Sequence, residues 1–157
     1  MSNTIKSIRP VDLTKTSLSA FKKHLADCVV LTHDNKILMQ QRPLSWGKSA
    51  GVLNIFGGHV EDGETVIQGL VRELKEELGA QIDEKDVVFI GAVSEEFTNH
   101  TELVHVHFWH DKNNTITGCY EAEAVRYDSA EGALAHPKIM DYAVWALGVC
   151  RDGGLIK

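Results

Sequence analysis

The first 60 residues contain apolar stretches of the length that strands have. Residues 26–31 are largely apolar, and residues 36–42 contain an apolar run at 37–39. The two segments flank a turn signal at residues 34–35, an arrangement that predicts a β-hairpin. Residues 52–56 add a short apolar strand, and the glycines after it, Gly57 and Gly58, are expected to form a turn. The glycine- and serine-rich segment between the hairpin and this strand is long enough to line a pocket.

The pattern then changes to the period of a helix. From residue 65 apolar side chains recur at three-to-four spacing, with Asp62 or Glu64 near the start and Gly79 at the end of the pattern. This spacing predicts a helix of about four turns. Its core-facing stripe contains three leucines, Leu70, Leu74 and Leu78.

The second half of the chain returns to strand patterns. Residues 87–93, 103–109 and 121–127 are expected to be mostly antiparallel strands, with a turn at residues 111–114. Residues 138–149 carry apolar side chains at three-to-four spacing, which predicts a closing amphipathic helix. The chain is therefore expected to build a sheet and to cover it with helices.

Length and composition are typical of one globular domain. The chain has 157 residues, so we expect a single domain over residues 1–157, in which residues 1–21 form an N-terminal arm or an edge segment. Its apolar runs are far shorter than a membrane span, and the first residues do not resemble a secretory signal, so the cytoplasm is the expected location. The three cysteines are far apart, which argues against a disulfide framework or a zinc site.

The charge narrows the range of partners. The chain has 16 Lys and Arg against 22 Asp and Glu, a net charge of -6, which is the wrong sign for a broad basic face that holds a nucleic-acid polymer. A small anionic substrate would need bound cations at such a protein. The sequence leaves the oligomeric state open, with a homodimer as one alternative.

Three glutamates of the predicted helix indicate its chemistry. Glu73, Glu76 and Glu77 stand at i, i+3 and i+4, which places their carboxylates on one face, where unpaired like charges destabilise a helix. Mg²⁺ and Mn²⁺ prefer oxygen ligands and commonly bridge protein carboxylates to substrate phosphates. The spacing therefore suits a divalent metal site beside a phosphate-bearing substrate.

These glutamates belong to a longer pattern, Gly-x5-Glu-x7-Arg-Glu-aliphatic-x-Glu-Glu-x-Gly-aliphatic. It is filled by Gly58, Glu64, Arg72, Glu73, Leu74, Glu76, Glu77 and Gly79. The pattern resembles the signature of the Nudix (MutT-like) hydrolase family. Ala80 stands at the last position, where the family usually has a larger aliphatic residue, and Phe56 stands before the glycine pair, where the family often has proline.

The resemblance implies a fold and a reaction. The fold is an α+β fold, a mixed β-sheet sandwiched between α-helices. The reaction is hydrolysis of a pyrophosphate bond in a nucleoside diphosphate derivative by water attack at phosphorus, with Mg²⁺ or Mn²⁺ as cofactor. A catalytically silent, nucleotide-binding regulatory domain of the same fold is the alternative, and the substrate itself is left open.

The resemblance also implies site residues. Arg72 would orient a neighbouring glutamate, and Glu64 would support the junction between loop and helix. These two residues form the expected catalytic group with Glu73 and Glu76. The expected metal ligands are the carbonyl of Gly57 and the carboxylates of Glu73, Glu76, Glu77 and Glu121.

Three further residues are candidates for substrate contact, each with a plainer alternative. Arg42 would contact a phosphate, or it simply ends a surface strand. Trp46 would stack on a base, or it covers the edge of the core. His59 would reach the substrate with its imidazole, or it is an ordinary loop residue.

The ligand outside the helix has two competing candidates. Family members commonly supply a carboxylate from a later strand or loop, and both Glu121 and Glu123 lie in the expected segment, on one face of an extended chain. We favour Glu121 because it is nearer the preceding glycine. If neither serves, Glu95 or Glu96 would supply the donor.

Overall fold

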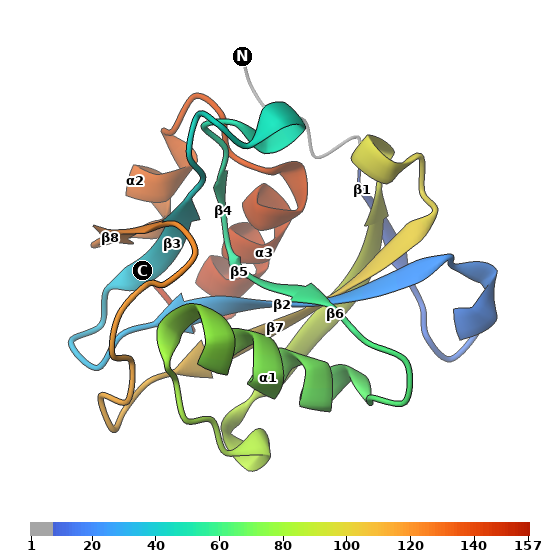
Figure 1. The fold of residues 1–157 in the computed structure, drawn as a ribbon, viewed down its shortest axis with the longest axis horizontal. Helices are drawn as coiled ribbons and strands as arrows, with labels where there is room; N and C mark the ends of the chain where they lie inside the picture. Colours follow the sequence, from blue (N-terminus) through green and yellow to red (C-terminus); the bar gives the residue numbers. More distant parts are fainter. Residues whose placement is uncertain (1–7) are drawn as a thin grey trace.

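The structure is a computed structural model that describes residues 8–157, so residues 1–7 of the expected arm lie outside the described part. One mixed sheet runs through the molecule, with helices on both of its faces (Figure 1). Its strands are β1 (Ile8–Val11), β2 (Lys23–Leu31), β3 (Ile37–Gln41), β4 (Leu53–Asn54), β5 (Phe56–His59), β6 (Val88–Glu95), β7 (Glu102–His110) and β8 (Glu123–Tyr127). The helices are α1 (Val66–Leu78), α2 (Ala130–Leu134) and α3 (Asp141–Asp152).

The sheet divides at β2. On one side β2 pairs in parallel with β7, and antiparallel pairing continues through β6 to β1. On the other side the end of β2 pairs with β3, while its first half pairs with β5. β3 continues away from β2 and pairs with β4 and β8. The sheet therefore has two branches: the β2 branch, which includes β5, and the β3 branch, which includes β4 and β8.

Each face of the sheet has its own core. Helix α1 packs on one face against alternate residues of β2, among them Ala26, Cys28 and Val30, through a leucine stripe that is fully buried. Helices α2 and α3 cover the other face, where Val29, Leu31 and the strands beside them form the larger core. Successive side chains of β2 therefore point into opposite cores, because side chains alternate between the two faces along a strand.

The structure confirms the α+β fold and most of the predicted elements. The hairpin, helix α1, strands β6 and β7 and the closing helix are all present, although α3 begins at Asp141. Residues 8–11 of the expected arm form the edge strand β1. The N-cap of α1 is Thr65, the residue from which the helical pattern was expected to begin, and Asp62 and Glu64 precede it. The sequence analysis missed α2.

Two expectations about residues 52–58 are wrong. The single strand is divided at Ile55 into β4 and β5, which pair with different branches of the sheet. The glycine pair is not a turn but part of β5. Gly57 has φ +140°, and a Cβ there would lie 2.2 Å from the carbonyl oxygen of Ala26. The glycine therefore permits a close approach between β5 and β2.

Within residues 8–157, the helices are all too short or too polar to cross a lipid bilayer.

Candidate active site

Helix α1 is fixed at both ends. Thr65 and Gln68 form a capping box, in which Thr65 Oγ1 accepts from the Gln68 amide at 3.2 Å and Gln68 Oε1 accepts from the Thr65 amide at 2.9 Å. Gly79 ends the helix in the left-handed conformation, with φ 67°. Because the leucine stripe is buried on the sheet, the glutamate face of the helix has one fixed direction.

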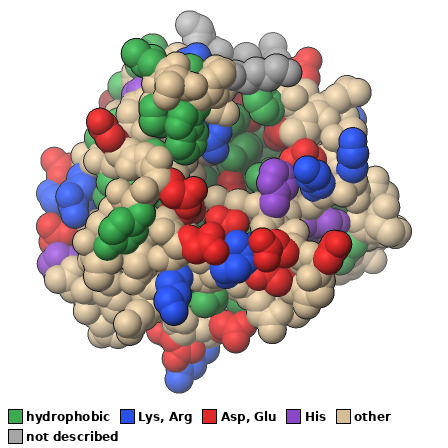
Figure 2. Space-filling model, in the orientation of Figure 1, with side chains coloured by type: hydrophobic (Ala, Val, Ile, Leu, Met, Phe, Trp, Pro, Cys, Tyr) green, Lys and Arg blue, Asp and Glu red, His purple; other side chains and the backbone are tan. Residues whose placement is uncertain are grey.

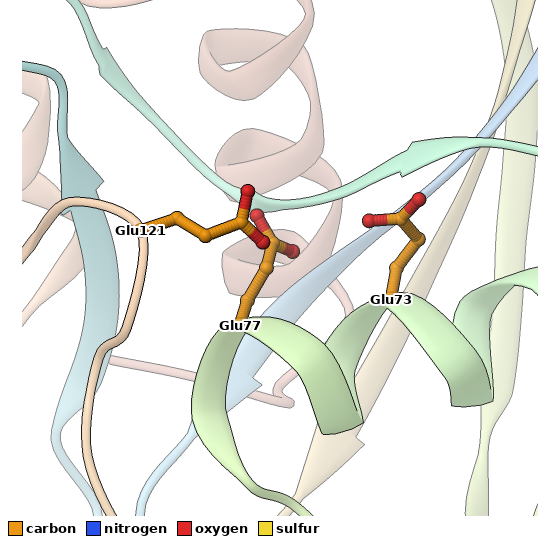
Figure 3. A group of neighbouring side chains, drawn as sticks. All are labelled: Glu73, Glu77 and Glu121. Atoms are coloured by element: carbon orange, nitrogen blue, oxygen red, sulfur yellow. The ribbon is translucent and has the colours of Figure 1, made fainter.

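Three carboxylates converge beside this helix (Figure 3). One oxygen atom from each of Glu73, Glu77 and Glu121 lies within 4.8 Å of the other two. Glu73 and Glu77 project from neighbouring turns of α1, whereas Glu121 comes from the segment before β8. The fold thus brings together oxygen donors from two separate segments of the chain.

Glu77 is the most deeply buried member of this acidic cluster, with 5% of its surface exposed. Its Oε1 accepts a hydrogen bond from the amide of Gly57 at 2.9 Å, and its Oε2 accepts one from the side chain of Gln40 at 3.1 Å. Burial raises the pKa of Glu77 to about 8, against the opposing effect of the Gly57 hydrogen bond. Burial therefore makes this carboxyl group harder to ionise than an ordinary glutamate unless a cation compensates its charge.

Arg72 connects the cluster to the loop before the helix. Its Nε and Nη2 donate to Glu64 at 2.7 and 3.0 Å, and its Nη1 donates to Glu73 at 2.9 Å. Nη2 also donates to the carbonyl oxygen of His59 at 3.0 Å. The hydrogen bonds from Arg72 lower the pKa of Glu64 to about 2. In the space-filling view, acidic side chains surround basic ones on this face of the molecule (Figure 2).

Glu73 lies against β5. A Cβ on Gly58 would stand 2.5 Å from the carboxyl carbon of Glu73, so a larger residue there would displace this carboxylate from its position. Burial raises the pKa of Glu73, and Arg72 opposes that effect. Gly58 and Arg72 together fix the direction in which this carboxylate points.

The three residues expected to contact the substrate have different neighbours in the structure. Arg42 stands at the end of β3, and its guanidinium carbon is 5.9 Å from the centroid of the partly exposed Trp46 ring. His59 contributes its backbone oxygen to Arg72, but its ring turns toward β7, where Nε2 lies 3.2 Å from Glu102 Oε1. The roles of Arg42, Trp46 and His59 in substrate contact stay predictions.

The remaining expected carboxylates lie outside the cluster. Glu76 is largely exposed, 3.6 Å from Arg72 Nη1, so its assignment as a ligand stays a prediction. Glu123 begins β8, opposite Gln41, whereas Glu121 precedes the strand, so the two do not share the extended segment that the sequence suggested. Glu95 ends β6 and Glu96 follows it.

Four polar residues near the cluster were missed by the sequence analysis. They are Asp27, Gln40, Asn54 and Tyr142, all buried. Asn54 Nδ2 donates to the Tyr142 hydroxyl at 2.7 Å. Asp27 is 2% exposed, its pKa is raised by burial to about 7, and its Oδ1 has no hydrogen-bond partner among the described residues. A single polar residue within an apolar strand run was the signal that could have identified Asp27 and Asn54. Gln40 is followed by two more polar residues, so it gave no such signal.

The donor set fits a hard divalent cation. The cluster offers only carboxylate oxygens, which Mg²⁺ and Mn²⁺ prefer. A cation bound there would also compensate the charge repulsion that helps to raise the pKa of both Glu73 and Glu77. Glu73, Glu77 and Glu121 are therefore the residues that would hold it.

The buried carboxyl groups predict how stability depends on pH. Burial raises the pKa of Asp27 to about 7 and that of Glu77 to about 8, above the value of about 4 that carboxyl groups have in an unfolded chain. Between these values the folded chain binds more protons than the unfolded chain, so the free energy of unfolding falls as pH rises. We expect the melting temperature of the metal-free protein to fall between about pH 5 and pH 8.

Thermal unfolding in a chelating buffer checks this expectation. Other groups also titrate in this range, so the quantity to compare is the difference between the protein and its Glu77→Gln variant. The melting temperature of the variant should fall less. Equal slopes in the two proteins would show that Glu77 is not the proton-binding group.

Two kinds of comparison identify relatives of this chain. Residues 22–144 match a family model described as "NUDIX domain". The chain is 36% identical over 110 residues to a CTP pyrophosphohydrolase of Escherichia coli (strain K12), a match that covers 69% of this chain and 77% of the relative. It is 34% identical over 108 residues to an oxidized purine nucleoside triphosphate hydrolase of Danio rerio, covering 69% of this chain and 63% of that protein.

A solved structure agrees with these matches. The solution structure of the E. coli ORF135 protein superposes with a TM-score of 0.63 at 29% identity, covering 88% of this chain and 97% of that one.

Proposed function

The chain belongs to the NUDIX domain family, and on that premise we propose that it is a divalent-metal-dependent hydrolase that cleaves a pyrophosphate bond of a nucleoside triphosphate. Relatives named for CTP and for oxidized purine nucleoside triphosphates support this substrate class. The observation that carries the proposal is the acidic cluster, in which two turns of α1 and the segment before β8 bring three carboxylates within 4.8 Å.

The residues around the cluster have separate tasks in this proposal. A divalent cation held there supplies positive charge that stabilises the negative charge developing on the phosphate oxygens. Arg42 binds a phosphate of the substrate, and Trp46 lies beneath its guanidinium. Arg72 holds Glu73 in place, while Glu64 ties Arg72 to the preceding loop through two hydrogen bonds. A carboxylate of this region accepts the proton of the attacking water.

The alternative, a silent nucleotide-binding domain, is less well supported. A domain that only binds has no need to collect three carboxylates whose mutual repulsion costs stability. In this fold, moreover, a charged residue, Glu77, occupies a buried position, and the absence of a side chain at Gly58 leaves space for the carboxylate of Glu73. Both features serve a functioning metal site.

Turnover of CTP and 8-oxo-dGTP with Mg²⁺ and with Mn²⁺ in ¹⁸O-labelled water tests the proposal. We expect a nucleoside monophosphate and pyrophosphate as products, with one labelled oxygen in one of them, because water attacks phosphorus. Binding of both nucleotides without turnover would favour the silent domain. Label that enters only a phosphate-free product would contradict attack at phosphorus.

A further inference from the structure

The side chain of Gln40 lies between two charged residues of the site. It projects from β3 toward α1 and is 3% exposed. Its Nε2 is 3.1 Å from Glu77 Oε2, and its Oε1 is 3.3 Å from Arg42 Nε. One amide group therefore connects an expected metal ligand with the expected phosphate-binding residue.

The direction of this amide is fixed by chemistry. An arginine side chain can only donate hydrogen bonds, so the Gln40 oxygen must face Arg42. The amide nitrogen then faces Glu77 and donates to it. A glutamine can satisfy both neighbours at once, whereas glutamate offers Glu77 no donor and an aliphatic residue serves neither.

Glu77 projects from α1 and contacts both branches of the divided sheet. Gly57, which donates to one oxygen of Glu77, belongs to β5 on the β2 branch. Gln40, which donates to the other oxygen, belongs to the β3 branch. Glu77 is thus held from both branches, and each carboxylate oxygen keeps a second lone pair for a cation.

Arg42 is oriented by the same amide. Among the described residues, its side chain donates one hydrogen bond, from Nε to Gln40, and its guanidinium lies near the Trp46 ring. This leaves both terminal nitrogens for a fork of hydrogen bonds to a phosphate. Without the Gln40 oxygen, the guanidinium of Arg42 would no longer be held in this orientation.

We propose that Gln40 is a positioning residue that couples the orientation of the metal ligand Glu77 to that of the substrate-binding Arg42. The inference rests on the proposed function for the roles of these two partners. Hydrogen-bond partners of metal ligands commonly contribute 10- to 100-fold to metal affinity. Gln40 would add an effect on substrate binding, because its other hydrogen bond reaches Arg42.

Metal binding without substrate is the first test. Mn²⁺ binding, followed by electron paramagnetic resonance, should weaken about 10-fold or more in a Gln40→Met variant. Gln41→Met is the matched control. Gln41 is the next residue of β3. Its amide bonds to the backbone carbonyls of Arg42 and Gly51 and to His136, and not to Glu77 or to the guanidinium of Arg42. Mn²⁺ affinity should be unchanged in this control, and an unchanged affinity in Gln40→Met would overturn the proposal.

The coupling to Arg42 is tested by substrate binding at saturating Mn²⁺. Gln40→Met should raise the KM for the best nucleotide about tenfold, the effect of losing one hydrogen bond to a charged group. In an Arg42→Met background the same change should have a much smaller effect. Equal effects in both backgrounds, or an unchanged KM, would show that Gln40 does not act through Arg42.

A second variant and a binding measurement allow the proposal to be tested even if the first variant or the proposed function fails. If Gln40→Met does not fold, Gln40→Asn replaces it, since its shorter amide cannot reach both partners, and the same losses are expected. If the enzyme binds nucleotides without hydrolysing them, the proposed function fails, whereas the Mn²⁺ titration and the nucleotide Kd still test Gln40.

Discussion

A Glu77→Gln variant is expected to lose about 10²- to 10⁴-fold in kcat while it remains folded. The change keeps the shape of the side chain but removes the negative charge that a divalent cation requires. The Gly57 amide can still donate to the new amide oxygen, and a buried group that resists ionisation is replaced by a neutral one. Steady-state kinetics with the best nucleotide and a thermal melt measure the two effects.

Glu131→Gln is a suitable control for this variant. Glu131 is an exposed glutamate of α2, so its replacement removes the same charge from a position without a contact to the cluster. Its kcat should remain unchanged. If Glu77→Gln instead lowers the melting temperature strongly and leaves kcat near its normal value, Glu77 has a structural role and the metal site lies elsewhere.

Removal of divalent cations is expected to abolish turnover, with a loss of about 10³-fold or more. The cluster alone places negative charge where the anionic substrate must bind, and a cation supplies several kcal/mol of transition-state stabilisation, each 1.36 kcal/mol being a factor of ten in rate. Exhaustive dialysis against a chelator, followed by turnover assays with and without added Mg²⁺ or Mn²⁺, measures the loss and its reversal.

The chelated protein should remain folded, because the hydrophobic cores on both faces of the sheet do not involve the cluster. A circular dichroism spectrum before and after dialysis checks this point. Full turnover in the chelated sample would exclude the proposed mechanism, and a loss that added cation does not restore would indicate damage to the protein.

Helix α1 is the part of the site that the sequence predicted best. The apolar stripe, the positions of Glu73 and Glu77 and the glycine stop all follow from residues within about one to four turns of each other. Such local relations depend on the helical period alone. The Nudix resemblance rests on the same segment, which is why the family could be recognised from the chain.

The division of the sheet was not predictable from residues 52–58. A short apolar run followed by two glycines has the same pattern whether it forms one strand and a turn or two strands on different branches. The structure decides between them through the close approach of Gly57 to Ala26. That contact joins segments about 30 residues apart, beyond the reach of local propensity.

The sequence by itself determined a Nudix-type α+β chain with a helix that presents glutamates on one face, because helical periodicity is a local property. The tertiary structure decided which carboxylates meet. It brings Glu121 from a distant segment to Glu73 and Glu77 and leaves Glu76 at the exposed side. It also decided that Gln40, 37 residues from Glu77, donates to that carboxylate. Contacts of this kind depend on how the two branches of the sheet pack on α1, and no spacing along the chain encodes them.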